Sequence, residues 1–246
     1  MSFEQDLKLA LDPVAFARAL GFSPDPWQVE ALRWDGKRLL LNCSRQTGKS
    51  TMAAILALHL ALYYSMSLIL LVSPSLRQSS ELFRKVTDLI KSLQTKPKLV
   101  EDNKLSCTFD NGSRIVSLPS TEATIRGFSG ANLIIEDEAS RVPDELYRAV
   151  RPMLATSEGK LILMSTPFGK RGHFFDEWEN EGWEKILVDA TECPRISTEF
   201  LEEEKRSMGD WWFKQEYMCE FVDSIDQVFS HESIMRAISS EVEPLF

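Results

Sequence analysis

The chain has 246 residues, of which 43% are hydrophobic and 26% are charged, as expected for one large domain or a domain with a small appendage. Its longest apolar runs are too short to cross a bilayer and its four cysteines form no C-x-x-C pair, so we expect a reduced intracellular protein without zinc, disulfides or membrane contact. The formal net charge of −9 arises in the acidic segment 176–204, so any contact with nucleic acid must be local or made through partners.

The first part of the chain alternates helices with strongly apolar strands. Apolar residues at helical spacing predict helices, and nearly continuous apolar runs predict strands that are covered on both faces. The predicted elements are helices over 4–20 (interrupted at Pro13), 27–34, 50–64 and 76–93, and strands over 38–43 and 68–73.

The middle of the chain adds a hairpin and further strands. Alternating residues over 105–118 surround Asn111-Gly112, a strong hairpin signal. Shorter apolar strands are predicted over 133–135, 161–164 and 185–188, and the pattern after about residue 190 is helical and acidic. Strands separated by helical crossovers predict an α/β fold with a mainly parallel sheet flanked by helices. We expect a core over 1–190 and a small helical lid or linker region over 191–246.

A Gly-Lys-Ser loop lies between the predicted strand over 38–43 and the helix that follows it. In the run SRQTGKS over 44–50, backbone N–H groups and the helix dipole would form an anion site. Gly48 allows close approach of phosphate, Lys49 would reach the β- and γ-phosphates, and the Ser50 hydroxyl would bind Mg²⁺. Cys43 replaces the first glycine of the usual G-x-x-x-x-G-K-[ST] pattern. The flanking strand and helix favour a phosphate loop over an ordinary helix start.

The acidic end of the strand over 133–135 is the second candidate motif. The run LIIEDEA over 133–139 places Asp137 directly before Glu138. Asp137 can hold Mg²⁺, and Glu138 can orient or deprotonate the attacking water, which are the two tasks of phosphoryl transfer to water. A solvated acidic loop is the alternative interpretation, and Glu136 is assigned no role.

These motifs occur in an order that resembles a known family. Gln28, SRQTGKS (44–50), IEDEAS (135–140) and MSTP (164–167) resemble the ATPase domain of the large terminase subunit, the DNA-packaging motor of tailed bacteriophages. That family tolerates a phosphate loop that lacks its first glycine and carries an arginine, as Arg45 does here. The run QEYMCEF (215–221) is similar to the family's linker region, so the resemblance covers nearly the whole chain. It implies a RecA-like P-loop NTPase fold of the ASCE class.

The resemblance implies roles for individual residues. Gln28 matches the glutamine that reads adenine, for which an amide that both donates and accepts is suited. Ser165 and Thr166 match the coupling motif that senses the γ-phosphate, although a simple cap at the strand end is an equal alternative. The implied nucleotide-binding residues are Gln28, Ser44, Arg45, Gln46, Thr47, Gly48, Lys49, Ser50, Thr51, Ser165 and Thr166, and the implied metal ligands are Ser50 and Asp137.

Three arginines compete for the role of arginine finger. Arg126 matches an arginine twelve residues before the catalytic Glu138, which in relatives is proposed to act on a neighbouring subunit. Arg45 would act within its own subunit, and Arg141 is a weaker third candidate. A finger neutralises charge in the transition state and can accelerate hydrolysis by about 10³–10⁵. A salt bridge or loop anchor is the alternative for Arg126.

The resemblance also implies an activity and partners. The expected activity is ATP hydrolysis to ADP and phosphate with Mg²⁺, coupled to translocation of double-stranded DNA into a procapsid. The expected partners are viral DNA, the portal protein, the small terminase subunit and further copies in a ring, expected to be a pentamer, with the isolated domain a monomer. We expect the protein in the host cytoplasm, transiently docked on the procapsid and absent from the mature virion.

Two other functions stay open at this point. A superfamily-two helicase fragment would share the glutamine, the loop and the DEAS box, but a working helicase needs a second RecA-like domain. A module that binds ATP without hydrolysis, for assembly or regulation, would have no need for Glu138 beside Asp137. Large terminases also carry a C-terminal nuclease domain, and we expect nuclease activity only in a full-length protein.

Overall fold

The fold is built on one eight-stranded sheet. The computed structural model describes residues 3–119 and 127–223. The strand order is β3-β4-β5-β2-β6-β7-β1-β8. Six neighbouring strands pair in parallel, namely β5, β2, β6, β7, β1 and β8. The strands are β1 (Arg38–Cys43), β2 (Leu68–Ser73), β3 (Leu99–Asp102), β4 (Ser106–Phe109), β5 (Arg114–Pro119), β6 (Leu133–Asp137), β7 (Lys160–Ser165) and β8 (Glu184–Val188). The predicted mainly parallel sheet is confirmed.

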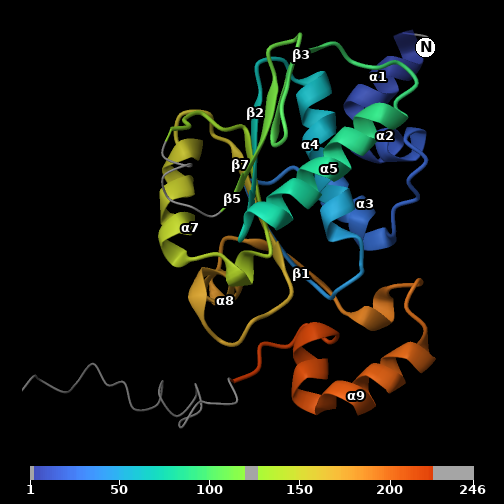
Figure 1. The fold of residues 1–246 in the computed structure, drawn as a ribbon, viewed down its shortest axis with the longest axis vertical. Coiled ribbons are helices and arrows are strands. Elements are labelled where there is room, and N and C mark those ends of the chain that lie inside the picture. Colours follow the sequence, from blue (N-terminus) through green and yellow to red (C-terminus); the bar gives the residue numbers. More distant parts are fainter. Residues whose placement is uncertain (1–2, 120–126, 224–246) are drawn as a thin grey trace, which may run out of the picture.

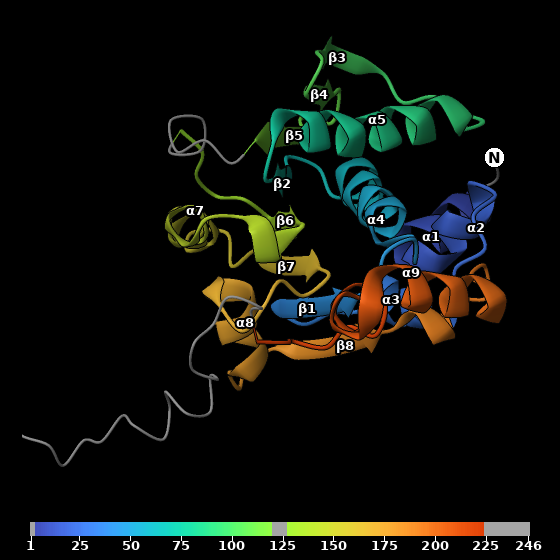
Figure 2. The same ribbon diagram turned by 60° about the horizontal axis from the view of Figure 1, so that its bottom comes forward.

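Helices cover both faces of this sheet (Figures 1 and 2). The helices on the first face are α1 (Phe3–Leu11), α2 (Pro13–Ala19), α3 (Pro26–Arg33), α4 (Lys49–Tyr63) and α5 (Leu76–Ser92), and those on the second face are α7 (Asp144–Val150) and α8 (Gly172–Glu179). Side chains of a strand alternate between the two faces, so Leu39 and Leu41 join the first core and Leu40 joins the second. The α/β fold with flanking helices follows from this arrangement.

The predicted hairpin forms at one edge of the sheet. Strands β4 and β5 pair antiparallel, and β3 adds an outer antiparallel strand that was not predicted. Gly112 has a φ of +81°, which favours glycine at this turn. The side-chain amide of Asn111 donates to the carbonyl of Ala61, so the turn also docks on the C-terminal end of α4.

The C-terminal part is a helix that packs beside the carboxyl ends of the strands. Helix α9 (Thr198–Glu216) forms a small core of its own, and the backbone leaves helical geometry at Gly209. The chain then returns to the sheet, where the Asn42 side chain of β1 donates to the Cys219 carbonyl at 2.9 Å. The expected division between 1–190 and 191–246 stays a prediction, because residues 224–246 lie outside the described part. No helix among the described residues is long and apolar enough to cross a membrane.

Candidate nucleotide-binding site

The phosphate loop connects β1 to α4 at the carboxyl end of the sheet. The loop is tied to β8 because the Ser44 N–H donates to the Val188 carbonyl, and it is closed internally because the Thr47 hydroxyl donates to the Ser44 carbonyl. Gly48 has a φ of +91° and directly precedes α4, so the first turn of that helix opens toward the loop. An N-terminal helix end with this approach is a favourable anion site.

The predicted catalytic and metal-binding residues meet beside this loop. Strand β7 lies between β1 and β6 in the sheet, and the start of α4 reaches across it to contact the end of β6. The Ser50 hydroxyl donates to Asp137 Oδ2 at 3.1 Å, and Lys49 Nζ lies 3.5 Å from Glu138 Oε1. Glu138 has a φ of +54°, an uncommon backbone conformation for a residue with a side chain. Strand end, loop and helix therefore place four predicted side chains in one cluster.

The electrostatics of this cluster favour a bound cation. Burial, and after it the charge of Glu138, raise the pKa of Asp137 to about 6 against the opposing effects of Lys49 and Ser50. Burial would lower the pKa of Lys49, but Glu138 and Asp137 outweigh it and hold that pKa above its usual value. A hydroxyl oxygen 3.1 Å from a buried carboxylate oxygen is a donor set that suits Mg²⁺. Ser50 and Asp137 therefore fit the predicted metal ligands.

These residues border an open cavity of ≈ 490 Å³. The lining residues are Arg45, Gln46, Gly48, Lys49, Ser50, Thr51, Gln78, Lys85, Glu138 and Arg141. Basic and hydroxyl side chains dominate this list, and Lys85 of α5 lies 3.3 Å from the Thr51 hydroxyl. A concave site of this size and charge can hold a polyphosphate.

Two of the candidate arginines share one buried carboxylate. Glu216, the last residue of α9, has a side chain that is 8% exposed. Its Oε2 accepts from Arg45 Nε at 2.5 Å and its Oε1 accepts from Arg141 at 3.3 Å. Both arginines line the cavity, and both are held at its edge by this helix end. Arg126, the third candidate, lies outside the described residues.

Gln28 lies against the phosphate loop, with its amide already bonded. Its oxygen accepts from the Asp25 N–H at 2.8 Å at the start of α3, and its nitrogen donates to the Thr47 carbonyl at 3.2 Å. A Cβ added at Gly48 would come within 2.9 Å of that nitrogen. The structure thus shows Gln28 as a support of the loop, and adenine recognition stays a prediction.

Ser165 and Thr166 lie at the end of β7 and are both buried. The Ser165 hydroxyl is 2.7 Å from the Ser140 hydroxyl, in the turn that follows Glu138. The predicted coupling segment therefore contacts the segment that carries the catalytic glutamate. Its role in sensing phosphate stays a prediction.

Two contacts to this site were not predicted. Glu216 lies in the linker-like run over 215–221 and Arg195 in the acidic segment, and the sequence predicted no role in the site for either. Arg195 donates to the Thr47 carbonyl at 3.0 Å and forms a bidentate pair with Asp25. Both residues come from the region after β8, and their partners lie 75 to 171 residues away in the sequence, so spacing gives no signal for them.

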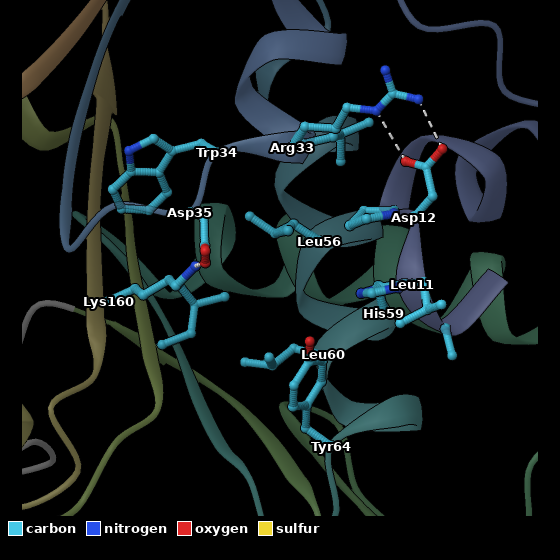
Figure 3. Close-up of a pocket in the computed structure, with 14 residues that line it drawn as sticks. Leu11, Asp12, Arg33, Trp34, Asp35, Leu56, His59, Leu60, Tyr64 and Lys160 are labelled. Atoms are coloured by element: carbon cyan, nitrogen blue, oxygen red, sulfur yellow. Dashed lines mark hydrogen bonds and ion pairs between the residues drawn. The ribbon is translucent and has the colours of Figure 1, made fainter. Parts of the chain in front are cut away.

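A larger cavity of ≈ 590 Å³ lies at the opposite, amino ends of the strands (Figure 3). Its charged residues are paired with one another, as Arg33 with Asp12 and Lys160 with Asp35. Apolar side chains such as Leu56 and Leu60 of α4 cover much of its wall. Ligands of parallel α/β sheets bind at the carboxyl ends of strands, which favours the smaller cavity as the nucleotide site.

Comparisons with known proteins agree with this assignment. The family model described as the terminase large subunit, T4likevirus-type, N-terminal, matches residues 40–236. The chain belongs to this family. It is 28% identical to the large terminase subunit of Escherichia phage T5 over 225 residues, which cover 85% of this chain and 50% of that protein. The chain spans about half the length of the curated relatives it matches.

Solved large terminases share the fold. The ATPase domain of Thermus phage P74-26, in a mutant form, superposes with a TM-score of 0.77 at 21% identity, covering 86% of this chain and all of that one. The large terminase of thermophilic bacteriophage D6E in complex with ADP superposes with a TM-score of 0.67 at 11% identity, over 81% of this chain and 54% of that one. The predicted RecA-like P-loop fold is confirmed by these likenesses.

Proposed function

We propose that this chain is the ATPase part of a terminase large subunit and hydrolyses ATP with Mg²⁺ to drive double-stranded DNA into a procapsid. The observation that carries the proposal is the cluster of Lys49, Ser50, Asp137 and Glu138 at one end of the sheet. Membership of the family supports it. The D6E terminase, which has this fold, was solved with ADP.

The residues divide the work of hydrolysis among them. Lys49 holds the β- and γ-phosphates, and Ser50 with Asp137 holds Mg²⁺, which when bound would neutralise charge on the transferring phosphoryl group. Glu138 has a side chain that is 25% exposed, so it can accept a proton from an attacking water in the cavity. Its Oε1 lies 3.5 Å from Lys49 Nζ, so the carboxylate is placed next to the lysine that would hold the phosphates.

The remaining functional predictions are part of the same proposal. We expect the chain to act in a ring at the portal, with the small terminase subunit as a further partner, and to work in the host cytoplasm. Arg45 and Arg141 are both held by Glu216, so a finger from a neighbouring subunit, Arg126, is the simplest way to complete the site. A nuclease activity would belong to a longer protein.

Mg-ATP hydrolysis, measured as a function of protein concentration, tests the proposal. We expect Lys49→Ala to lose nucleotide binding and Glu138→Gln to bind Mg-ATP without cleaving it, while Lys91→Ala, an exposed lysine on α5, serves as the control. Normal hydrolysis in Lys49→Ala would refute the site. ATP binding without hydrolysis in the native chain at any concentration would favour a binding module.

The same experiment distinguishes the finger candidates. A specific rate that climbs with concentration and falls in Arg126→Ala means that a neighbour completes the site. A specific rate that is constant with concentration and insensitive to Arg126→Ala means a site complete within one subunit, and Arg45 then becomes the finger.

A further inference from the structure

A buried histidine lies behind the acidic strand end, on the sheet face opposite the phosphate loop. His173, near the start of α8, has a side chain that is 5% exposed. Its Nε2 lies 2.9 Å from Glu136 Oε1, and its Nδ1 lies 3.0 Å from Asp144 Oδ1. The ring stacks on Tyr147 with centroids 4.4 Å apart and an interplanar angle of 9°. Each ring nitrogen therefore faces a carboxylate.

This geometry determines the charge of the ring. A neutral imidazole carries one N–H and could donate to one of the two carboxylates, whereas an imidazolium donates to both. Burial would lower the pKa of His173, but the hydrogen bonds and charges of Glu136 and Asp144 outweigh it and raise that pKa above its usual value. The other facing group, Tyr147, donates its hydroxyl to Glu177 and presents the electron-rich face of its ring. The two carboxylates and the raised pKa both favour the imidazolium form of His173.

The carboxylate that most needs this cation is Glu136. Its side chain is 1% exposed, and its Oε2 has no hydrogen-bond partner among the described residues. Glu136 directly precedes Asp137 and Glu138 in β6, so an uncompensated charge there would add to the repulsion within the acidic cluster. His173, 2.9 Å from Glu136 Oε1, offers a compensating charge on the face of the sheet opposite the phosphate loop.

The same contacts connect the two segments that carry the catalytic and coupling residues. Asp144 also accepts the backbone N–H of His173 at 2.8 Å, which ties the start of α8 to the start of α7. The contact of Ser140 with Ser165, at 2.7 Å, is the second tie between these segments. Together they enclose the turn in which Glu138 adopts its uncommon backbone conformation.

We propose that His173, as an imidazolium between Glu136 and Asp144, is a positioning residue that sets the placement of Asp137 and Glu138. The role rests on the hydrolysis of ATP proposed above. It is exerted from the far face of the sheet, through Glu136, and His173 itself touches neither nucleotide nor metal. Glu136 thereby gains a function as the link between the histidine and the site.

The kinetics of variants that remove one or both charges of this pair test the proposal. We expect His173→Gln to lower kcat for ATP by about 10- to 100-fold, the range typical of residues that orient a site through its ligands, with little change in nucleotide affinity. Glu136→Gln added to that variant removes the uncompensated charge and should recover most of kcat. His59→Gln is the matched control, because His59 is also buried but contacts the Leu9 carbonyl. A purely structural role predicts no rescue by Glu136→Gln.

The charge state is measured without turnover by NMR of ¹⁵N-histidine-labelled protein, with His173→Gln used to assign the signal. At about pH 8, above the ordinary histidine pKa of about 6.5, both ring nitrogens of His173 should remain protonated. A neutral His173 ring at that pH overturns the proposal, as does hydrolysis that His173→Gln leaves unchanged. A native chain that fails to hydrolyse ATP under every condition overturns the proposed function itself, and the positioning role with it.

Discussion

Glu216 offers a direct test of how the end of α9 is held against the phosphate loop. The variant Glu216→Gln keeps the size of the side chain and removes its charge, and its amide nitrogen then faces a guanidinium. Hydrogen bonds that involve a charged group contribute about 1.5–3 kcal/mol, and exposed ion pairs below about 1 kcal/mol. The carboxylate is 8% exposed, but Arg45 and Arg141 are 59% and 31% exposed. We therefore expect a loss of about 1–2 kcal/mol in the free energy of unfolding.

Thermal unfolding measures this loss. For a chain of this size, 1 kcal/mol corresponds to about 2–4 °C in Tm, so Glu216→Gln should melt about 2–8 °C below the native protein. Glu203→Gln is the matched control, because it makes the same change at an exposed position of the same helix. A double variant with Arg45→Gln should lose less than the sum of the two single variants. Equal melting temperatures for Glu216→Gln and Glu203→Gln would refute the assigned role.

Other predictions concern buried or strained positions. Gly48→Ala should cost about 1–2 kcal/mol and weaken nucleotide binding in titrations, because of its φ of +91°, while Gly127→Ala, with no atom within 4 Å of its added Cβ, should not. Burial lowers the pKa of His59, so its contribution to stability is present above about pH 6.5 and is lost as pH falls through its folded pKa. The pKa of His173 is raised, so its contribution is present below about pH 6.5 and is lost as pH rises through its folded pKa. Melting curves of the two His→Gln variants across pH should therefore differ from the native protein with opposite slopes, up to about 1.4 kcal/mol per pH unit, and equal slopes would contradict the assignment. All four cysteines are free and buried, and burial raises the pKa of Cys43 to about 12, so thiol reagents at about pH 8 should react only after denaturation.

The core strands could be predicted because the apolar character of their own residues indicates that they are buried. A strand buried on both faces is mostly apolar, as the runs over 38–43 and 68–73 are. The hairpin was equally local, since Asn111-Gly112 specifies its turn. Helices α7 and α8 were not predicted. Strand β3 was also missed, because it has only four residues and is largely exposed, so it lacks the apolar pattern of a core strand.

The site could be predicted in part for the same reason. Four of the site residues belong to short motifs that can be recognised from adjacent residues alone, namely Lys49, Ser50, Asp137 and Glu138. Glu216 and the other supporting residues act through partners that only the fold brings close. Glu136 was assigned no role because its contact is with His173, which lies 37 residues later in the sequence.

The strand order has a consequence for how the protein is made. Strand β1, which leads into the phosphate loop, has as its neighbours β7 and β8, so Asn42 pairs with Ser165 on one side and Leu187 on the other. During synthesis at about 5–20 residues per second, β1 is made roughly 6–30 seconds before these partners are complete. Such distant pairings are slow to form, because loop-closure entropy must be overcome first. The phosphate loop, whose Ser44 N–H donates to the Val188 carbonyl, can therefore reach its final conformation only after β8 has been made.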